Sequence, residues 1–156
     1  YKGADLPKVN PDIKSITCPY TGEELATVPA HNPDVAFIHA QKANEKGDVL
    51  IEGIVGVQKE VALAAKRVVV TVEEIVPDFA GMPPNLTVLP HWTVTAIAKV
   101  KGGAHPSYTH GYYARDNAAY LAWNEISADR ELFAKWMDEN VLNATPEVFA
   151  ERVKGL

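Results

Sequence analysis

Residues 34–76 read DVAFIHAQKANEKGDVLIEGIVGVQKEVALAAKRVVVTVEEIV, and this stretch decides the fold. Short apolar runs at Val35–Ile38, Val49–Ile51 and Val68–Val72 have the length and composition of buried strands. Between the last two runs, apolar side chains recur at helical spacing from Val57 to Ala65. Strands that alternate with a helix are typical of an α/β fold, so we predict a mainly parallel open sheet flanked by helices.

The chain downstream of this stretch predicts two more strands and then helices. Leu86–Leu89 and Val94–Val100 have strand character. Gly102–Tyr113 contains three glycines, one proline and two histidines, which indicates a loop. Asp116 is suited to cap a helix, because apolar and aromatic residues follow it at three-to-four spacing. Thr145–Val153 opens with a capping threonine followed by proline, which predicts a last short helix.

The chain upstream predicts little helix and one small hairpin. Residues 1–33 hold five of the eleven prolines, which disfavours a long helix. Ile13–Cys18 and Leu25–Val28 flank a Pro-Tyr-Thr-Gly turn and predict two short paired strands. The chain opens at Tyr1 without an initiator methionine. We therefore expect residues 1–156 to form a single domain that is the C-terminal part of a longer polypeptide.

Composition and charge exclude several classes of protein. Hydrophobic residues make up 47% of the chain and charged residues 22%, as in ordinary globular domains. The 15 Lys and Arg residues are scattered and the formal net charge is -5, which argues against a nucleic-acid binder. No apolar run approaches the roughly 20 residues that cross a bilayer. A single cysteine, Cys18, fits a reducing compartment, so we expect a cytoplasmic protein.

Polar side chains follow two of the predicted strands at the point where each apolar run ends. His39, Gln41 and Lys42 come after Val35–Ile38, and the pair Glu73-Glu74 comes directly after Val68–Val72. Ligands of open α/β sheets bind beyond the carboxyl ends of the strands, which makes these residues candidates for a binding site. The alternative is that the two glutamates are solvated loop acids or begin a helix.

Other constellations of reactive residues are weaker. The five histidines include His105 and His110 in one loop, but no spacing typical of a metal site accompanies them and Cys18 has no partner cysteine. Ser107, His105 and Asp116 supply the residue types of a hydrolytic triad without the strand-to-helix elbow that presents the nucleophile. The sequence therefore assigns no metal ligand and no catalytic residue.

Three ordered blocks of this sequence resemble the alpha subunits of family I coenzyme A transferases. Pro33–Asn44 with Gly47-Asp48 is similar to the segment of that family with an aspartate, an apolar strand and an Ile-His-Ala step. Lys59–Val76 resembles the helix and strand that follow there. Gly102–Ser107 with Gly111–Tyr113 resembles the glycine-alanine-histidine-proline loop of the glutaconate branch.

The resemblance covers roughly residues 20–125 and departs from the family pattern in two respects. Asp48 stands where the family often has asparagine. The N-terminal half of a family alpha subunit, with its glycine-rich oxyanion loop, has no counterpart in this chain. In the family, the glutamate that takes up CoA as a thioester belongs to the beta subunit, so we assign that role to no residue here.

The resemblance implies a function and a set of pocket residues. The family transfers CoA from an acyl-CoA thioester to a carboxylic acid in ping-pong fashion, with no permanently bound cofactor. This chain is expected to shape the acyl pocket and the interface with a beta subunit in a hetero-oligomer. The candidate substrate-binding residues, from strand-end position and resemblance together, are His39, Gln41, Glu73, Glu74, His105 and Tyr108.

Two alternative functions remain open from the sequence. One is a hydrolase or ring-opening enzyme for CoA thioesters on the same scaffold, as in relatives from steroid-ring breakdown. Such an enzyme need not form the glutamyl thioester of a transferase. The other is a non-catalytic binding module, which binds its ligand without a second chain.

Overall fold

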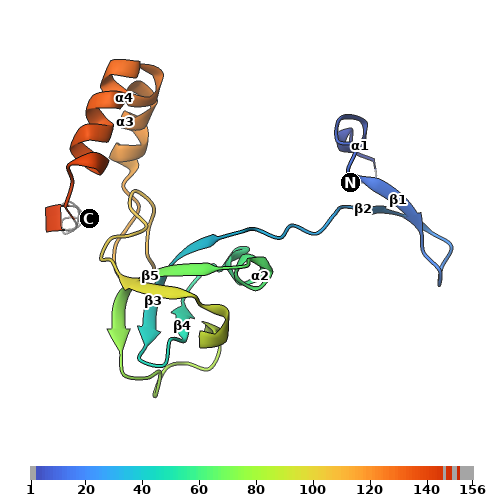
Figure 1. The fold of residues 1–156 in the computed structure, drawn as a ribbon, viewed down its shortest axis with the longest axis horizontal. Helices are drawn as coiled ribbons and strands as arrows, with labels where there is room; N and C mark the ends of the chain where they lie inside the picture. Colours follow the sequence, from blue (N-terminus) through green and yellow to red (C-terminus); the bar gives the residue numbers. More distant parts are fainter. Residues whose placement is uncertain (1–2, 146, 149–150, 152–156) are drawn as a thin grey trace. The chain divides into compact units, whose positions relative to one another are not determined.

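The computed structural model describes residues 3–145, 147–148 and 151. The chain divides into two units, Tyr1–Asn32 and Pro33–Leu156, which are drawn in Figure 1 and described separately below. The sequence-based expectation of a single domain that is part of a longer polypeptide stays a prediction.

The first unit is a short helix followed by a β-hairpin. Helix α1 spans Leu6–Val9. Strands β1 (Lys14–Thr17) and β2 (Glu24–Thr27) pair antiparallel, as the sequence predicts. Their connection turns at Gly22, whose φ of 72° lies in the left-handed region that glycine adopts without strain.

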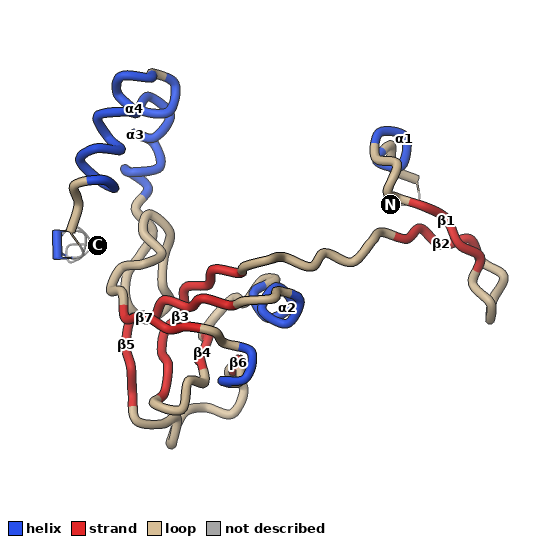
Figure 2. Tube along the Cα trace, in the orientation of Figure 1, coloured by secondary structure: helices blue, strands red, loops and turns tan. Residues whose placement is uncertain are grey.

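The second unit is built on a five-stranded sheet. Its strands are β3 (Ala36–Asn44), β4 (Val49–Ile51), β5 (Val68–Val76), β6 (Thr87–Leu89) and β7 (Ala96–Lys99), in the spatial order β6-β4-β3-β5-β7. Strands β3, β5 and β7 run parallel, whereas β4 is antiparallel to both of its neighbours. Strand β6 therefore shares the direction of β3, and of the five strands β4 alone runs the other way. Figure 2 labels these strands and draws them in red. The mainly parallel sheet is as predicted.

The direction of β4 follows from the turn that precedes it. Asn44 Oδ1 accepts hydrogen bonds from the backbone N–H groups of Lys46 and Asp48, and Gly47 has a φ of 92°. This tight turn joins β3 to β4 as a hairpin, because a parallel connection needs a dozen or more residues. The parallel neighbours of β5 are β3 and β7 rather than β4, which corrects the strand-helix-strand unit that the sequence indicates.

The core lies on one face of the sheet, where aliphatic side chains from alternate strand positions meet helix α2 (Gln58–Ala64). Val68, Val70 and Val72 of β5 are fully buried. Each such side chain contributes about 1.5–3 kcal/mol of burial free energy. The apolar run of β3 predicts cover on both faces, yet Phe37 is 78% exposed, so the sheet's other face is open at this position in this chain.

Strands β3 and β5 extend well beyond the apolar runs that predict them. The sequence places their ends near Ile38 and Val72, but each strand is nine residues long, and they run to Asn44 and Val76. His39, Gln41, Glu73 and Glu74 therefore lie within strands, and their placement beyond strand ends is wrong. Their side chains contact neighbouring segments, so the backbone pairing of β3 with β5 continues through these polar residues.

The chain ends in a hairpin of helices. Asp116 caps α3 (Asn117–Ala128), as predicted, by accepting a hydrogen bond from the Ala119 N–H. Asp129 then interrupts the helical pattern, because its carboxylate caps a second helix, α4 (Arg130–Met137).

The two helices lie side by side (Figure 1). Their aromatic side chains pack together: Trp123 of α3 meets Trp136 and Phe133 of α4 edge-on, at ring-centroid distances of 4.8 and 6.1 Å. A π-helical turn, Asp138–Leu142, follows α4. The short helix predicted for Thr145–Val153 falls largely outside the described residues. Within the part that the structure describes, no helix is both long and apolar enough to span a membrane.

Candidate functional site

The register of β3 against β5 brings a histidine and a glutamate together. His39 lies opposite Thr71 in the parallel ladder, and Thr71 and Glu73 share a face of β5 because side chains alternate along a strand. The imidazole Nδ1 is 2.8 Å from the Thr71 hydroxyl, and Nε2 is 2.8 Å from Glu73 Oε1. Both ring nitrogens are thus engaged by side chains of β5.

Glu73 is buried, with 4% of its side chain exposed. Both of its carboxylate oxygens accept from the backbone N–H of Gly102, at 3.1 and 3.0 Å, in the loop that follows β7. A buried carboxylate is costly unless it is paired and hydrogen-bonded, and the imidazole and this N–H meet that requirement. The three parallel strands are therefore joined at one place through a single side chain.

Gln41 links β3 by side-chain hydrogen bonds to the segment on its other side, which follows β4. Its Nε2 donates to the Glu52 carbonyl at 3.2 Å, and its Oε1 accepts from the Glu52 N–H at 3.0 Å. Just after β4 ends, the Gln41 side-chain amide thus makes the donor and acceptor hydrogen bonds that a backbone amide would make in a sheet. It fixes the position of the segment that leads from the sheet towards α2.

A cavity of about 260 Å³ opens between these strands and the loop that follows β7. The strands contribute one wall and the loop contributes the other. The lining residues are His39, Gln41, Ile51, Glu52, Ile54, Gln58, Ala104, Ser107, Tyr108, Thr109 and His110. Gln58 also lines the cavity, and its Oε1 is buried with no hydrogen-bond partner among the described residues.

Glu74 lies beside the end of the same loop. Burial and the nearby Glu74 carboxylate raise the pKa of Tyr112 above its ordinary value. Tyr112 therefore remains a neutral hydrogen-bond donor. Glu74 does not line the cavity.

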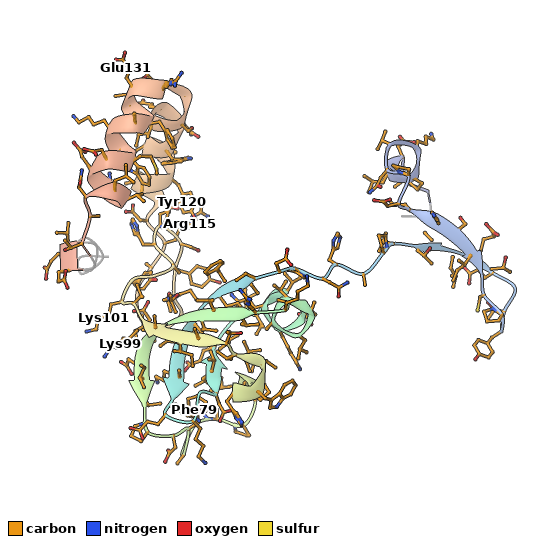
Figure 3. All side chains as sticks on the ribbon, in the orientation of Figure 1. Phe79, Lys99, Lys101, Arg115, Tyr120 and Glu131 are labelled. Carbon is orange, nitrogen blue, oxygen red and sulfur yellow. The ribbon has the colours of Figure 1, made fainter. Side chains whose placement is uncertain are left out.

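His105 belongs to a different part of the unit. Its Nε2 is 3.0 Å from Asp116 Oδ2, and the Ala119 N–H together with His105 lowers the pKa of Asp116. His105 lines a second cavity of about 550 Å³, which is largely apolar and is formed with residues of the helical hairpin such as Trp123 and Trp136. Figure 3 labels Arg115 and Tyr120 where the loop enters α3, and the guanidinium lies 4.2 Å from the ring centroid.

The structure gathers some of the predicted pocket residues and separates others. His39, Gln41 and Tyr108 line the first cavity, and Glu73 lies behind it in contact with His39. Glu74 lies near Tyr112 of the loop, whereas His105 faces the second cavity. The substrate-binding role of these six residues stays a prediction.

Sequence reasoning missed several residues of this region. Thr71 lies inside an apolar run, Glu52 stands between predicted elements and Gln58 lies in the predicted helix, so nothing in the local pattern marks them. Ser107 lines the first cavity although its triad partners, His105 and Asp116, pair elsewhere. Among the described residues, no group of three or more His, Cys, Asp or Glu side chains is arranged to hold a metal ion.

Comparison with known proteins identifies the family. The family model described as coenzyme A transferase matches residues 6–100. The chain belongs to the coenzyme A transferase family, and it is related to the alpha subunits of family I.

Two relatives show how far the similarity extends. The chain is 62% identical over 141 residues to the A subunit of 3-oxoadipate CoA-transferase from Pseudomonas knackmussii, a match that covers 90% of this chain and 50% of that protein. The crystal structure of glutaconate coenzyme A-transferase from Acidaminococcus fermentans superposes with a TM-score of 0.81 at 32% identity, over 92% of this chain and 46% of that one. That likeness confirms the predicted fold class.

The decarboxylase AibA/AibB, solved as a cysteine-to-serine variant, is also similar. Its TM-score is 0.67 at 33% identity, over 87% of this chain and 50% of that one. The chain spans about half the length of the curated relatives it matches.

Proposed function

We propose that this chain is part of the alpha subunit of an enzyme that transfers coenzyme A between an acyl-CoA thioester and a carboxylic acid. The observation that carries the proposal is the 62% identity, along 90% of the chain, to a protein named as the A subunit of a CoA-transferase. Such close similarity favours the transferase over the hydrolase and over a non-catalytic module.

The proposal divides the work between two polypeptides. Covalent catalysis splits the exchange into two acyl-transfer steps, and the carboxylate that becomes the thioester is expected on a beta subunit. The relatives are named as A subunits, which supports a second polypeptide as the partner of this chain. We assign the present chain a share of the acyl pocket and of the subunit interface. The single cysteine supports a cytoplasmic location.

The first cavity is our candidate for this chain's share of the pocket. His39, Gln41 and Tyr108 bring polar groups to it, and Gln58 Oε1 awaits a donor. Among the residues that the structure describes, neither lysine nor arginine lines it, while Glu52 does. This charge pattern suits a neutral part of an acyl-CoA that donates hydrogen bonds, such as an amide N–H, better than a free carboxylate.

The proposal is tested on the enzyme assembled with its partner subunit. We expect exchange of CoA between an acyl-CoA and a dicarboxylic acid, together with a glutamyl thioester on the partner that hydroxylamine traps. Release of CO₂ without CoA exchange would instead place the enzyme with the decarboxylase. Steady hydrolysis without a trapped thioester would place it with the hydrolases.

A substitution at Gln58 tests the cavity itself. Gln58→Leu removes the unpaired acceptor, so we expect a KM for acyl-CoA about tenfold higher, with kcat changed much less, because a hydrogen bond to the bound ligand is lost. Asp34→Asn is the matched control, since Asp34 is exposed and lies at the opposite end of β3. An unchanged KM in Gln58→Leu would remove the cavity from the pocket.

A further inference from the structure

The acidic pair Glu73-Glu74 makes its contacts with a loop. Glu73 accepts two hydrogen bonds from Gly102, at the start of the segment 102–113. Glu74 lies near Tyr112, at the end of the same segment, where its carboxylate helps to raise the pKa of that hydroxyl. We call this segment the 102–113 loop; Glu73 holds its start.

The start of this loop is pressed against His39. A Cβ atom added to Gly103 would lie 2.6 Å from His39 Nδ1, 2.7 Å from Cε1 and 3.2 Å from the Val100 carbonyl oxygen. No side chain fits there unless the imidazole or the loop moves. The imidazole cannot turn away freely, because Thr71 and Glu73 engage both of its nitrogens.

The end of the loop is tied back to its start. The Tyr113 hydroxyl accepts hydrogen bonds from the Ala104 N–H at 2.9 Å and from the Thr109 hydroxyl at 2.8 Å. Thr109 and Tyr113 also form an antiparallel bridge. The loop is thus a closed structure that moves as a unit if its anchor on β5 is lost.

The residues that follow this anchor form one wall of the first cavity. Ala104, Ser107, Tyr108, Thr109 and His110 all come from the 102–113 loop. We propose that Glu73 is a positioning residue, which holds the 102–113 loop against the sheet and so fixes the shape of the cavity without touching the substrate. This inference deepens the proposed function, since its effect on activity rests on the cavity being part of the pocket.

Hydrogen exchange tests the anchoring independently of any activity. In the assembled enzyme without substrate, Glu73→Gln should speed amide exchange in peptides that contain Gly102 at least tenfold, because one of two carboxylate acceptors becomes a donor. Asp34→Asn should leave the loop protected. Unchanged exchange in Glu73→Gln would overturn the inference, even for an enzyme with no transferase activity.

Kinetics then separate positioning from substrate contact. A misplacement of about 1 Å can cost on the order of a hundredfold in rate, so we expect kcat/KM to fall in step with loop exchange across Glu73→Gln and Glu73→Ala, with the amide variant milder. A large loss of kcat/KM in Glu73→Gln with normal loop exchange would mean that Glu73 meets the substrate directly, and the inference would fail.

The close contact at Gly103 supplies a second, sterically defined test. Gly103→Ala should loosen the 102–113 loop and lower kcat/KM at least tenfold. In an enzyme that already carries His39→Ala, the same change should alter either quantity by less than about threefold, because residues in contact are coupled. Equal effects in the two backgrounds would show that the loop does not rest on the imidazole.

Discussion

The parallel strands β3 and β5 carry two close side-chain pairs, one just before the strands begin and one in their interior, and the two pairs differ in almost everything except distance. Before the strands begin, Lys66 Nζ lies 2.7 Å from Asp34 Oδ1, with the side chains 70% and 85% exposed. Further along, His39 Nε2 lies 2.8 Å from Glu73 Oε1, with 12% and 4% exposed.

The difference teaches that geometry alone does not set the strength of such a contact. The exposed pair is surrounded by water, which solvates both partners whether or not they meet. The buried pair has no such alternative, because the strand ladder and the 102–113 loop exclude water from Glu73. Removal of one partner therefore leaves a buried polar group unpaired only at the second site.

The largest effect is expected for Glu73→Ala. It leaves the Gly102 N–H and His39 Nε2 without their acceptor and opens a void, so the free energy of unfolding should fall by about 3–5 kcal/mol. Urea denaturation of the assembled protein measures it. A fall in the free energy of unfolding of less than about 1 kcal/mol would mean that the buried His39–Glu73 pair contributes little more than the exposed Asp34–Lys66 pair.

A smaller effect is expected for Thr71→Val, which keeps the shape of the side chain. The valine removes the hydroxyl that meets His39 Nδ1 at 2.8 Å. One partly buried ring nitrogen loses its partner, at a cost of about 1–2 kcal/mol. The same denaturation series measures this cost, and a stabilised variant would show that the Thr71 hydroxyl is not part of the network.

Asp48 provides an intermediate case and a pH dependence. Hydrogen bonds from Asn44 and from the His91 backbone lower the pKa of Asp48 below its ordinary value. A lowered pKa means that the folded protein binds the proton less readily than the unfolded chain. This contribution is therefore complete above about pH 4 and is lost as pH falls through the folded-state pKa.

We accordingly expect Asp48→Asn to cost about 1 kcal/mol at neutral pH, a modest amount because His91 is 60% exposed. The gap between wild type and variant should narrow as the pH drops below about 4. Denaturation curves at several pH values measure this gap. If the difference in the free energy of unfolding between wild type and Asp48→Asn widened on acidification, the lowered pKa of Asp48 would be contradicted.

The smallest effect is expected for Asp34→Asn. Both partners of its ion pair are exposed, so the free energy of unfolding should change by less than about 0.5 kcal/mol. High salt should not alter the difference measurably. A loss comparable to that of Thr71→Val would mean that exposure is a poor guide to the strength of these pairs.

The same contrast explains which site residues the sequence could indicate. His39 and Glu73 attract notice because they interrupt apolar runs, and the structure joins them. The sequence has no means of pairing them, since 34 residues separate the two and the register of β3 on β5 decides the contact. Gln58 and Thr71 carry no local signal at all, because their importance arises only where a cavity or a ring nitrogen meets them.

The sequence by itself determined the β-hairpin, the apolar strands, helix α2 and the cap of α3, because these depend on periodicity and turn chemistry among near neighbours. Only the tertiary structure decided how far β3 and β5 extend and which strands pair with β5. The extension depends on polar groups that are stable inside a strand only when distant segments supply their hydrogen bonds.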